Sequence, residues 1–371
     1  MSYFSRVGIG PQGLPRIPVM KPLPVKTDFL TPRIQSIAAS GIFSNRGPQV
    51  RELETRLAAW LNVNEANLVV TSNATVALTA AIALSPATSW HVPAWSFPAT
   101  ALAPLHIGKP ITFVDIDPDT WLAVDHRDDP ATGLMNVIPF GGSFDQTAWS
   151  HPGEVVIDAA ASLATRPLGL NDFPESAAVV FSLHATKTMG GGEGGVVIFG
   201  SASRAKQARS WINFGFSGAR ESVLLGTNGK MSEYDAAVAN ARLDGWGEES
   251  VEWLRIRELA REASQKLGLK PTPASMDAIG PYWIALFNSP EEREQAVNSL
   301  TGNGIETRLW WGEGLYRMNA FSSVAQGELP VVKNLSRRYL GLPFFVGLSE
   351  SNAKEVSQLV ANTLKPETST D

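Results

Sequence analysis

The sequence predicts an α/β fold, with a mostly parallel sheet in a large domain and a smaller α+β domain toward the C-terminus. Seven short runs rich in β-branched residues show no alternation of apolar and polar positions, which indicates strands buried on both faces. Helix-forming segments separate several of these runs, as expected for a parallel sheet covered by helices. The seven expected strands lie at 67–71, 90–92, 111–115, 136–139, 154–158, 178–182 and 195–199.

The N-terminal half begins with an arm. Residues 1–32 hold six prolines, so we expect an extended segment there rather than a helix. Apolar residues recur at helical spacing over 49–61, which predicts the first helix. Further helices are expected at 76–84 and at 100–106, each after one of the first two strands. These elements predict a large domain that covers 33–247.

The C-terminal part starts with helical signals at 231–243 and 249–267, which predict two helices, the second linking the domains. A small domain of 248–371 is then expected to hold a strand at 281–287, a helix at 290–300 that starts at a proline, a strand at 304–308, and a closing helix at 349–364 capped by Ser349 or Ser351.

Composition excludes several classes of function. The net charge is -5 and no basic cluster is present, so nucleic-acid binding has no support. The chain has no cysteine, which excludes disulfides, thiolate metal sites and thiol nucleophiles, and we expect no metal site. The most apolar stretch, Val76 to Leu84, is too short to span a membrane, and no secretory signal is visible. We therefore expect a soluble cytoplasmic protein without a membrane partner.

The densest group of reactive residues lies between the last two strands. There, Ser182 at a strand end is followed by Lys187 and by a run of glycines up to Gly195. A lysine at the carboxyl end of a strand can meet a ligand in the crevice outside the sheet, and lysine forms Schiff bases with carbonyl groups. A surface lysine in a glycine loop is the competing interpretation.

Three weaker features lie at other strand ends. The turn at 72–75, followed by Val76, can present backbone amides to an anion at a helix N-terminus, or it is an ordinary capped helix. Phe97 can stack on a flat ring or belong to the core. Asp158 can keep a pyridine nitrogen protonated, or it can cap a helix or bind a metal. Anion turn, aromatic residue, acid and lysine together, in this order, indicate a site for pyridoxal 5′-phosphate (PLP).

The chain resembles the DegT/DnrJ/EryC1/StrS family of sugar aminotransferases, which have the fold of aspartate aminotransferase (fold type I). The resemblance runs from about Pro15 to Leu364. It is carried by runs at 44–48, 93–97, 108–116, 157–160, 181–195, 228–233 and 342–343.

By this resemblance, Lys187 would form the Schiff base with PLP and Asp158 would pair with the pyridinium nitrogen. Phe97 would stack on the ring. The phosphate would be held by Thr75, the backbone near Val76, Ser182 and, from the other subunit, Asn228, which implies a homodimer with shared active sites.

Several positions depart from the family pattern. Ala161 stands where the family usually has Gln or His over the cofactor ring, and Phe140 and Tyr316 stand where histidines are common. Lys230 stands where the family often has Arg. These departures concern the substrate rather than the covalent anchor, and Lys187 argues against the branch of the family that has His there and performs dehydration.

The resemblance implies a transaminase that moves an amino group from glutamate to a keto sugar linked to a nucleotide diphosphate. Arg308, Trp310 and Trp311 either line the acceptor site or are core and surface residues. Two alternatives stay open: an aminotransferase for a cyclitol or other cyclic ketone, and a PLP-binding regulator without catalysis. The retained Lys187 and Asp158 favour an enzyme.

Overall fold

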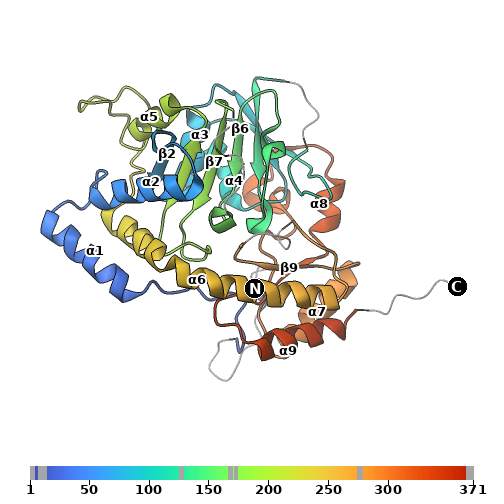
Figure 1. Ribbon diagram of the computed structural model, residues 1–371. Coiled ribbons are helices and arrows are strands. Elements are labelled where there is room, and N and C mark those ends of the chain that lie inside the picture. Colours follow the sequence, from blue (N-terminus) through green and yellow to red (C-terminus); the bar gives the residue numbers. More distant parts are fainter. Residues whose placement is uncertain are drawn as a thin grey trace.

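The computed structural model describes residues 5–6, 15–124, 129–165, 170, 174–273 and 279–364. Within them the chain forms an eight-stranded sheet and a four-stranded sheet, with helices around both (Figure 1). The strand order of the large sheet is β11-β4-β3-β5-β6-β7-β8-β2. Seven strands answer to the seven predicted runs: β2 (Leu68–Thr71), β3 (Ser89–Pro93), β4 (Ile111–Val114), β5 (Thr132–Val137), β6 (Val155–Asp158), β7 (Ala177–Ser182) and β8 (Gly195–Phe199).

The eighth strand, β11 (Ala325–Gln326), was not predicted. It pairs in parallel with the edge strand β4 although it lies far along the chain. Two exposed residues leave no hydrophobic pattern, so a sequence cannot reveal such a pairing. The fourth predicted strand, 136–139, lies earlier in the structure: β5 begins four residues before position 136. It ends before Pro139, because a proline cannot donate to a strand ladder.

Strand direction brings several chain segments to one edge of the large sheet. The strands from β11 to β7 run parallel to one another, and β8 runs antiparallel to both β7 and β2. Strand β2 therefore runs in the same direction as β7. As a result, the carboxyl ends of β2, β3, β6 and β7 and the start of β8 share one edge.

Each face of the large sheet is buried against its own set of helices. Val179 and Phe181 of β7 belong to the core that includes α2 (Pro48–Leu61) and α6 (Glu233–Lys266). Ala178 and Val180 belong to the opposite core, which includes α3 (Ala74–Ala83), α4 (Pro98–Leu105) and α5 (Ala202–Trp211). Burial on both faces explains why the strands lack alternation.

The smaller sheet has the order β1-β10-β12-β9 and is antiparallel throughout. Its strands are β1 (Ser5–Arg6), β10 (Thr307–Arg308), β12 (Tyr339–Leu342) and β9 (Trp283–Leu286). Helices α7 (Pro290–Gly302) and α9 (Glu350–Ala361) pack together beside it, and α8 (Pro330–Leu335) lies between β11 and β12 in the chain. The Ser349 hydroxyl accepts from the Asn352 amide at 3.1 Å, so Ser349 rather than Ser351 caps α9.

The two helices predicted at 231–243 and 249–267 are one helix. Helix α6 runs without interruption for 34 residues. Its glycines weaken helix propensity, but Trp246, Glu249 and Trp253 are buried there, and burial overrides propensity. A Cβ at position 245 would lie at ordinary contact distance, 3.4 Å, from the Phe29 ring of α1. The predicted domain boundary at 247 falls inside α6, and the division into domains stays a prediction.

The predicted arm ends earlier than expected. Helix α1 (Thr27–Ser40) begins within it and contains Pro32. The helix lies against α6, where the Arg33 guanidinium pairs with Asp244 at 2.9 Å and reaches Glu52 on α2. These ion pairs and the packing stabilise a helix that its proline disfavours. In the described ranges, no helix is both long and apolar enough to cross a membrane.

Candidate active site

Backbone register places three of the predicted site elements side by side. Thr71, the last residue of β2, and Ser182, the last residue of β7, both pair with Gly195 at the start of β8. Asp158, the last residue of β6, pairs with Val180 of β7. The turn after β2, the hydroxyl of Ser182 and the carboxylate of Asp158 therefore lie at one edge of the sheet, which we call the carboxyl edge.

The turn after β2 leads directly into helix α3. The Asn73 side chain caps the helix by accepting from the Val76 amide at 3.0 Å. In the described part of the chain, the amides of Ala74 and Thr75 have no protein acceptor. An anion at this helix N-terminus would therefore meet the amides of Ala74 and of Thr75, the second of which is an expected phosphate contact.

A glycine makes room for this turn. A Cβ at Gly195 would lie 2.4 Å from the carbonyl oxygen of Asn73 and 2.5 Å from the Thr71 hydroxyl, so no other residue fits. Next to it, the Ser182 hydroxyl accepts from the His184 amide at 3.1 Å. That contact leaves the hydroxyl hydrogen of Ser182 available for an anion.

Asp158 is a buried acid, only 6% exposed. The Thr100 hydroxyl donates to it at 2.8 Å and the Ala160 amide at 3.2 Å, and Thr100 in turn lies 2.7 Å from the Ser96 hydroxyl. Burial raises the pKa of the Asp158 carboxyl, while the two hydrogen bonds and the charge of Lys187 act in the opposite direction. Within the described ranges Asp158 forms no ion pair, so it is a buried carboxylate able to accept a cation.

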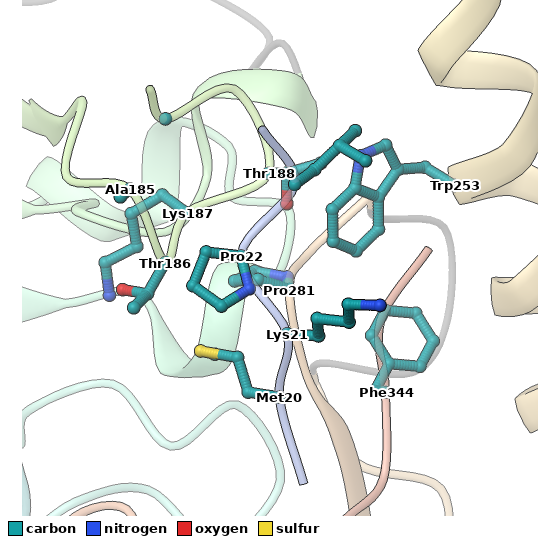
Figure 2. Close-up of a pocket in the computed structure, with 12 residues that line it drawn as sticks. Met20, Lys21, Pro22, Ala185, Thr186, Lys187, Thr188, Trp253, Pro281 and Phe344 are labelled. Atoms are coloured by element: carbon teal, nitrogen blue, oxygen red, sulfur yellow. The ribbon is translucent and has the colours of Figure 1, made fainter. Parts of the chain in front are cut away.

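Lys187 lies in the loop between β7 and β8. Its Nζ donates to the Tyr282 hydroxyl at 2.9 Å and lies 5.4 Å from the centre of that ring. Lys187 is among the residues that line a narrow pocket with Pro22 and Trp253, and Figure 2 shows its amine pointing away from Trp253. The amine therefore faces the carboxyl edge and the region of Tyr282.

A buried arginine of α6 binds the loop that carries Lys187. Arg242 of α6 donates to the carbonyl of Gly190 at 2.9 Å and also to the carbonyl of Leu23 in the N-terminal segment. Its guanidinium pairs with Glu249 at 2.6 Å, and both side chains are buried. One side chain thus ties the lysine loop, α6 and the N-terminal segment together.

Aromatic side chains from distant segments lie beside Lys187. We call this group the aromatic wall: Trp95, Phe140, Tyr282, Trp310 and Trp311. Phe140 stacks on Trp311 with ring centroids 4.0 Å apart, and Tyr282 contacts Phe140 at 5.8 Å and Trp310 at 4.8 Å. The Arg308 guanidinium lies 4.9 Å from the Trp310 ring centre and also pairs with Glu306. Trp310 contacts Tyr282, and Arg308 contacts Trp310, so both lie in a chain of contacts that leads to Lys187.

Two residues that the sequence predicts to contact the cofactor, Phe97 and Asn228, are exposed to solvent. Phe97, the N-cap of α4, has 58% of its surface exposed. Asn228 accepts from the Lys230 amine at 2.7 Å, and the carbonyl of the next residue, Gly229, accepts from the Ser72 amide at 2.8 Å. The segment around Asn228 therefore touches the anion turn of its own chain, and its predicted contact from a second subunit stays a prediction.

The structure adds two site residues that the sequence did not indicate. Thr100 lies one helical turn after Phe97 and orients Asp158. Tyr282 directly precedes β9, in a run that the sequence predicts as a buried strand. A hydroxyl in a helix and a tyrosine in an apolar run carry no signal of function in a single sequence. Ala161, at the position over the expected ring, is 9% exposed. In the described part of the chain, no group of three or more His, Asp or Glu residues is arranged to hold a metal ion.

Comparison with known proteins agrees with this geometry. The sequence profile of the DegT/DnrJ/EryC1/StrS aminotransferase family matches residues 25–361. A dTDP-4-amino-4,6-dideoxy-D-glucose transaminase of Shigella dysenteriae is 28% identical, with 92% of this chain and 96% of the relative covered. Protein Rv3402c of Mycobacterium tuberculosis is 26% identical, with 90% and 87% covered.

A solved structure extends the likeness to three dimensions. DesI, determined in the presence of its TDP-sugar product, matches with a TM-score of 0.81 and 28% identity, with 96% of this chain and 94% of DesI covered. The fold, the order of the strand-end residues and the family profile agree. This chain belongs to the DegT/DnrJ/EryC1/StrS aminotransferase family, whose members are fold type I PLP enzymes.

Proposed function

We propose that this chain binds PLP at the carboxyl edge and transfers an amino group from glutamate to a keto sugar linked to a nucleotide diphosphate. The observation that carries the proposal is the carboxylate of Asp158. It is buried, held by Thr100 and Ala160, and lies within the electrostatic reach of Lys187. A buried acid with two donors and no ion pair in the described ranges suits a cationic ring nitrogen.

The residues present fit the other parts of PLP. The free amides of Ala74 and Thr75 and the hydroxyl of Ser182 would hold the phosphate beside Gly195. Phe97, with an exposed ring, would stack on the pyridine. Lys187 would supply the amine that anchors the aldehyde. When bound, PLP supplies an electron sink for the carbanion that forms at the donor Cα.

The side chains then have distinct tasks. Asp158 would hold the cationic ring nitrogen, and that cation would offset the cost of burying the carboxylate. The Lys187 amine would act as the general base and acid that moves a proton from the donor Cα. The aromatic wall covers the amine on one side and limits the access of water.

The nucleotide-linked acceptor is supported by the relatives and by the wall. The Shigella relative is a dTDP-sugar transaminase, and DesI was solved with a TDP-sugar. Trp310 offers a flat aromatic surface and Arg308 a cation beside it, a combination suited to a base or sugar ring and a diphosphate. Arg308 also pairs with Glu306, which fixes the guanidinium in place.

We propose that the active form is a homodimer. Large apolar side chains are exposed on the segments around the site: Ile42, Phe43, Phe214, Val223, Leu225 and Tyr234. Leu225 is fully exposed, and Phe43 stacks on Tyr234 at 6.2 Å. Exposed apolar groups of this size indicate an interaction surface. Sedimentation of wild type and Leu225→Ser checks this: we expect a dimer and a weakened dimer, and a monomeric wild type at micromolar concentration contradicts it.

The acceptor is identified by a two-stage experiment. The purified protein is loaded with PLP, converted with glutamate, freed of small molecules and given single candidate acceptors. Nucleotide-linked keto sugars, the same sugars without the nucleotide, and cyclic ketones form the panel, with mass spectrometry of the products. We expect amination of a nucleotide-linked keto sugar. Amination of free cyclic ketones alone would replace this acceptor with the cyclitol class.

A further inference from the structure

The hydroxyl of Tyr282 is the one side-chain hydrogen-bond partner that the described part of the chain gives to the Lys187 amine. Asp158 acts on this amine only through its charge. We infer that Tyr282 is a positioning residue, which holds the amine of Lys187 toward the reacting carbon whenever the amine is not bonded to the cofactor. This inference rests on the proposed function and adds a residue to it.

The backbone before Tyr282 is fixed to the lysine loop. The Thr188 hydroxyl, one residue after the lysine, donates to the carbonyl of Ile279 at 3.0 Å. On the other side, the chain touches the turn at Gly141: a Cβ at Gly280 would lie 2.7 Å from the carbonyl oxygen of Phe140. Close backbone packing on both sides fixes the position of Tyr282 just before β9.

The ring of Tyr282 is also held by its neighbours. Phe140 meets it nearly perpendicularly, with an interplanar angle of 81° and a centroid distance of 5.8 Å, and Trp310 lies 4.8 Å away. Aromatic contacts of this kind restrict the ring and thereby the position of its hydroxyl. The phenol oxygen therefore stands at a defined point 2.9 Å from the Lys187 amine.

A phenol suits this task because it can both accept and donate. The charged amine carries three donors and no acceptor, so it donates to the Tyr282 oxygen, as seen here. The neutral amine has a lone pair, to which the phenol can donate. A long, flexible lysine stem would otherwise sample many rotamers, and orientation of a reacting group contributes strongly to rate.

The test separates docking of the cofactor from attack by the lysine. Full-length wild type, Tyr282→Phe, Lys187→Ala and, as a matched control, Tyr316→Phe are prepared without cofactor. Affinity for pyridoxamine 5′-phosphate, which cannot bond to Lys187, is measured by tryptophan fluorescence. The rate at which added PLP produces the visible band of lysine-bound cofactor is measured in a stopped-flow instrument without any amino donor.

For Tyr282→Phe we expect an affinity for pyridoxamine 5′-phosphate within about twofold of wild type and a bond-forming rate lowered by about tenfold or more. Tyr316→Phe should change neither quantity. A Tyr282→Phe rate within twofold of wild type overturns the inference. So does a parallel loss of affinity and rate, since that is the result of disturbed packing. If wild type itself gives no lysine-dependent band, the proposed function fails, and the inference with it.

Discussion

The carboxyl edge and the aromatic wall are adjacent but built in different ways. The edge consists of strand ends, free amides and a few short polar side chains, namely Ser182, Asp158 and its partner Thr100. The wall consists of large rings contributed by loops and strand starts far apart in the chain. Sheet register fixes the edge, whereas side-chain packing fixes the wall.

This difference suggests that the edge binds the cofactor and that the wall selects the substrate. A register is hard to alter without losing the sheet, so the edge suits a cofactor that all members of a family share. Rings can be exchanged one at a time, so the wall suits the choice of substrate. Phe140 shows the constraint on the wall: its backbone has φ of 51°, a left-handed conformation that is rare for a bulky residue. The sequence resemblance leads one to expect histidine at that position, and here the side chain is a phenyl ring.

The largest expected effect is a loss of stability when Arg242, which holds the lysine loop beside the carboxyl edge, is replaced. Replacing Arg242 by Met leaves Glu249 buried without its partner and frees the carbonyl of Gly190. Breaking a buried ion pair on one side costs about 3–5 kcal/mol, and we expect a loss of unfolding free energy of about that size. Urea denaturation measures it.

The double variant Arg242→Met with Glu249→Leu is the control for this prediction. Because it removes both charges, it should recover part of the lost stability. If Arg242→Met costs less than about 1 kcal/mol, the lysine loop does not depend on α6.

The edge itself is tested at Gly195. In Gly195→Ala the new methyl group would approach the carbonyl oxygen of Asn73 to 2.4 Å, so the turn before α3 must move. We expect PLP affinity to fall by about tenfold or more, because the amides of Ala74 and Thr75 lose their alignment. Equilibrium dialysis measures the affinity. Gly247→Ala, whose Cβ meets nothing within 4 Å, is the control and should bind PLP as wild type does.

The wall is tested at Trp310, with the opposite pattern of effects. In Trp310→Ala the partner ring of Tyr282 and the surface under Arg308 are lost. We expect KM for the keto-sugar acceptor to rise by about tenfold, with PLP affinity unchanged. The reaction with glutamate should slow by a smaller factor, because Phe140 still contacts the Tyr282 ring. Steady-state kinetics with the two substrates varied separately give this split. An equal change in both halves of the reaction would remove the distinction between edge and wall.

The smallest expected effect is a pH dependence of the stability of the cofactor-free protein, caused by Asp158. Burial raises its pKa in the folded, cofactor-free protein, so the folded state keeps a proton that the unfolded state has already lost. This contribution to stability is complete below the ordinary carboxyl pKa and disappears as pH rises through the raised value. The Tm of cofactor-free wild type minus that of Asp158→Asn should therefore fall as pH rises. A flat or rising difference is the contrary result.

Most of the edge is predictable from the sequence, because its signals are local. A buried β-branched run followed by Asp158, or by Ser182 and Lys187, places each residue at a strand end, and parallel strands bring those ends together. The expected phosphate contacts at Thr75 and near Val76 stay a prediction, and the Val76 amide already donates to the Asn73 side chain as a helix cap. Capping by that side chain depends on its rotamer, which the sequence does not show.

The wall and the long helix were less predictable for a physical reason. Phe140 and Tyr282 come together where glycines at 141 and 280 let two distant segments touch. Helix α6 continues across Gly245 and Gly247 because tertiary burial outweighs local propensity. Contacts of this kind arise from packing between distant segments, and a single sequence does not encode them in any local pattern.

The most direct test of the proposed chemistry is the visible absorption spectrum of the protein with PLP, before and after addition of glutamate, in wild type and in Lys187→Ala. The account predicts a visible band that requires Lys187 and that glutamate bleaches in wild type. A band that glutamate leaves unchanged would favour another amino donor or a PLP-binding regulator. Absence of any lysine-dependent band would contradict the assignment of Lys187 as the anchor of the cofactor.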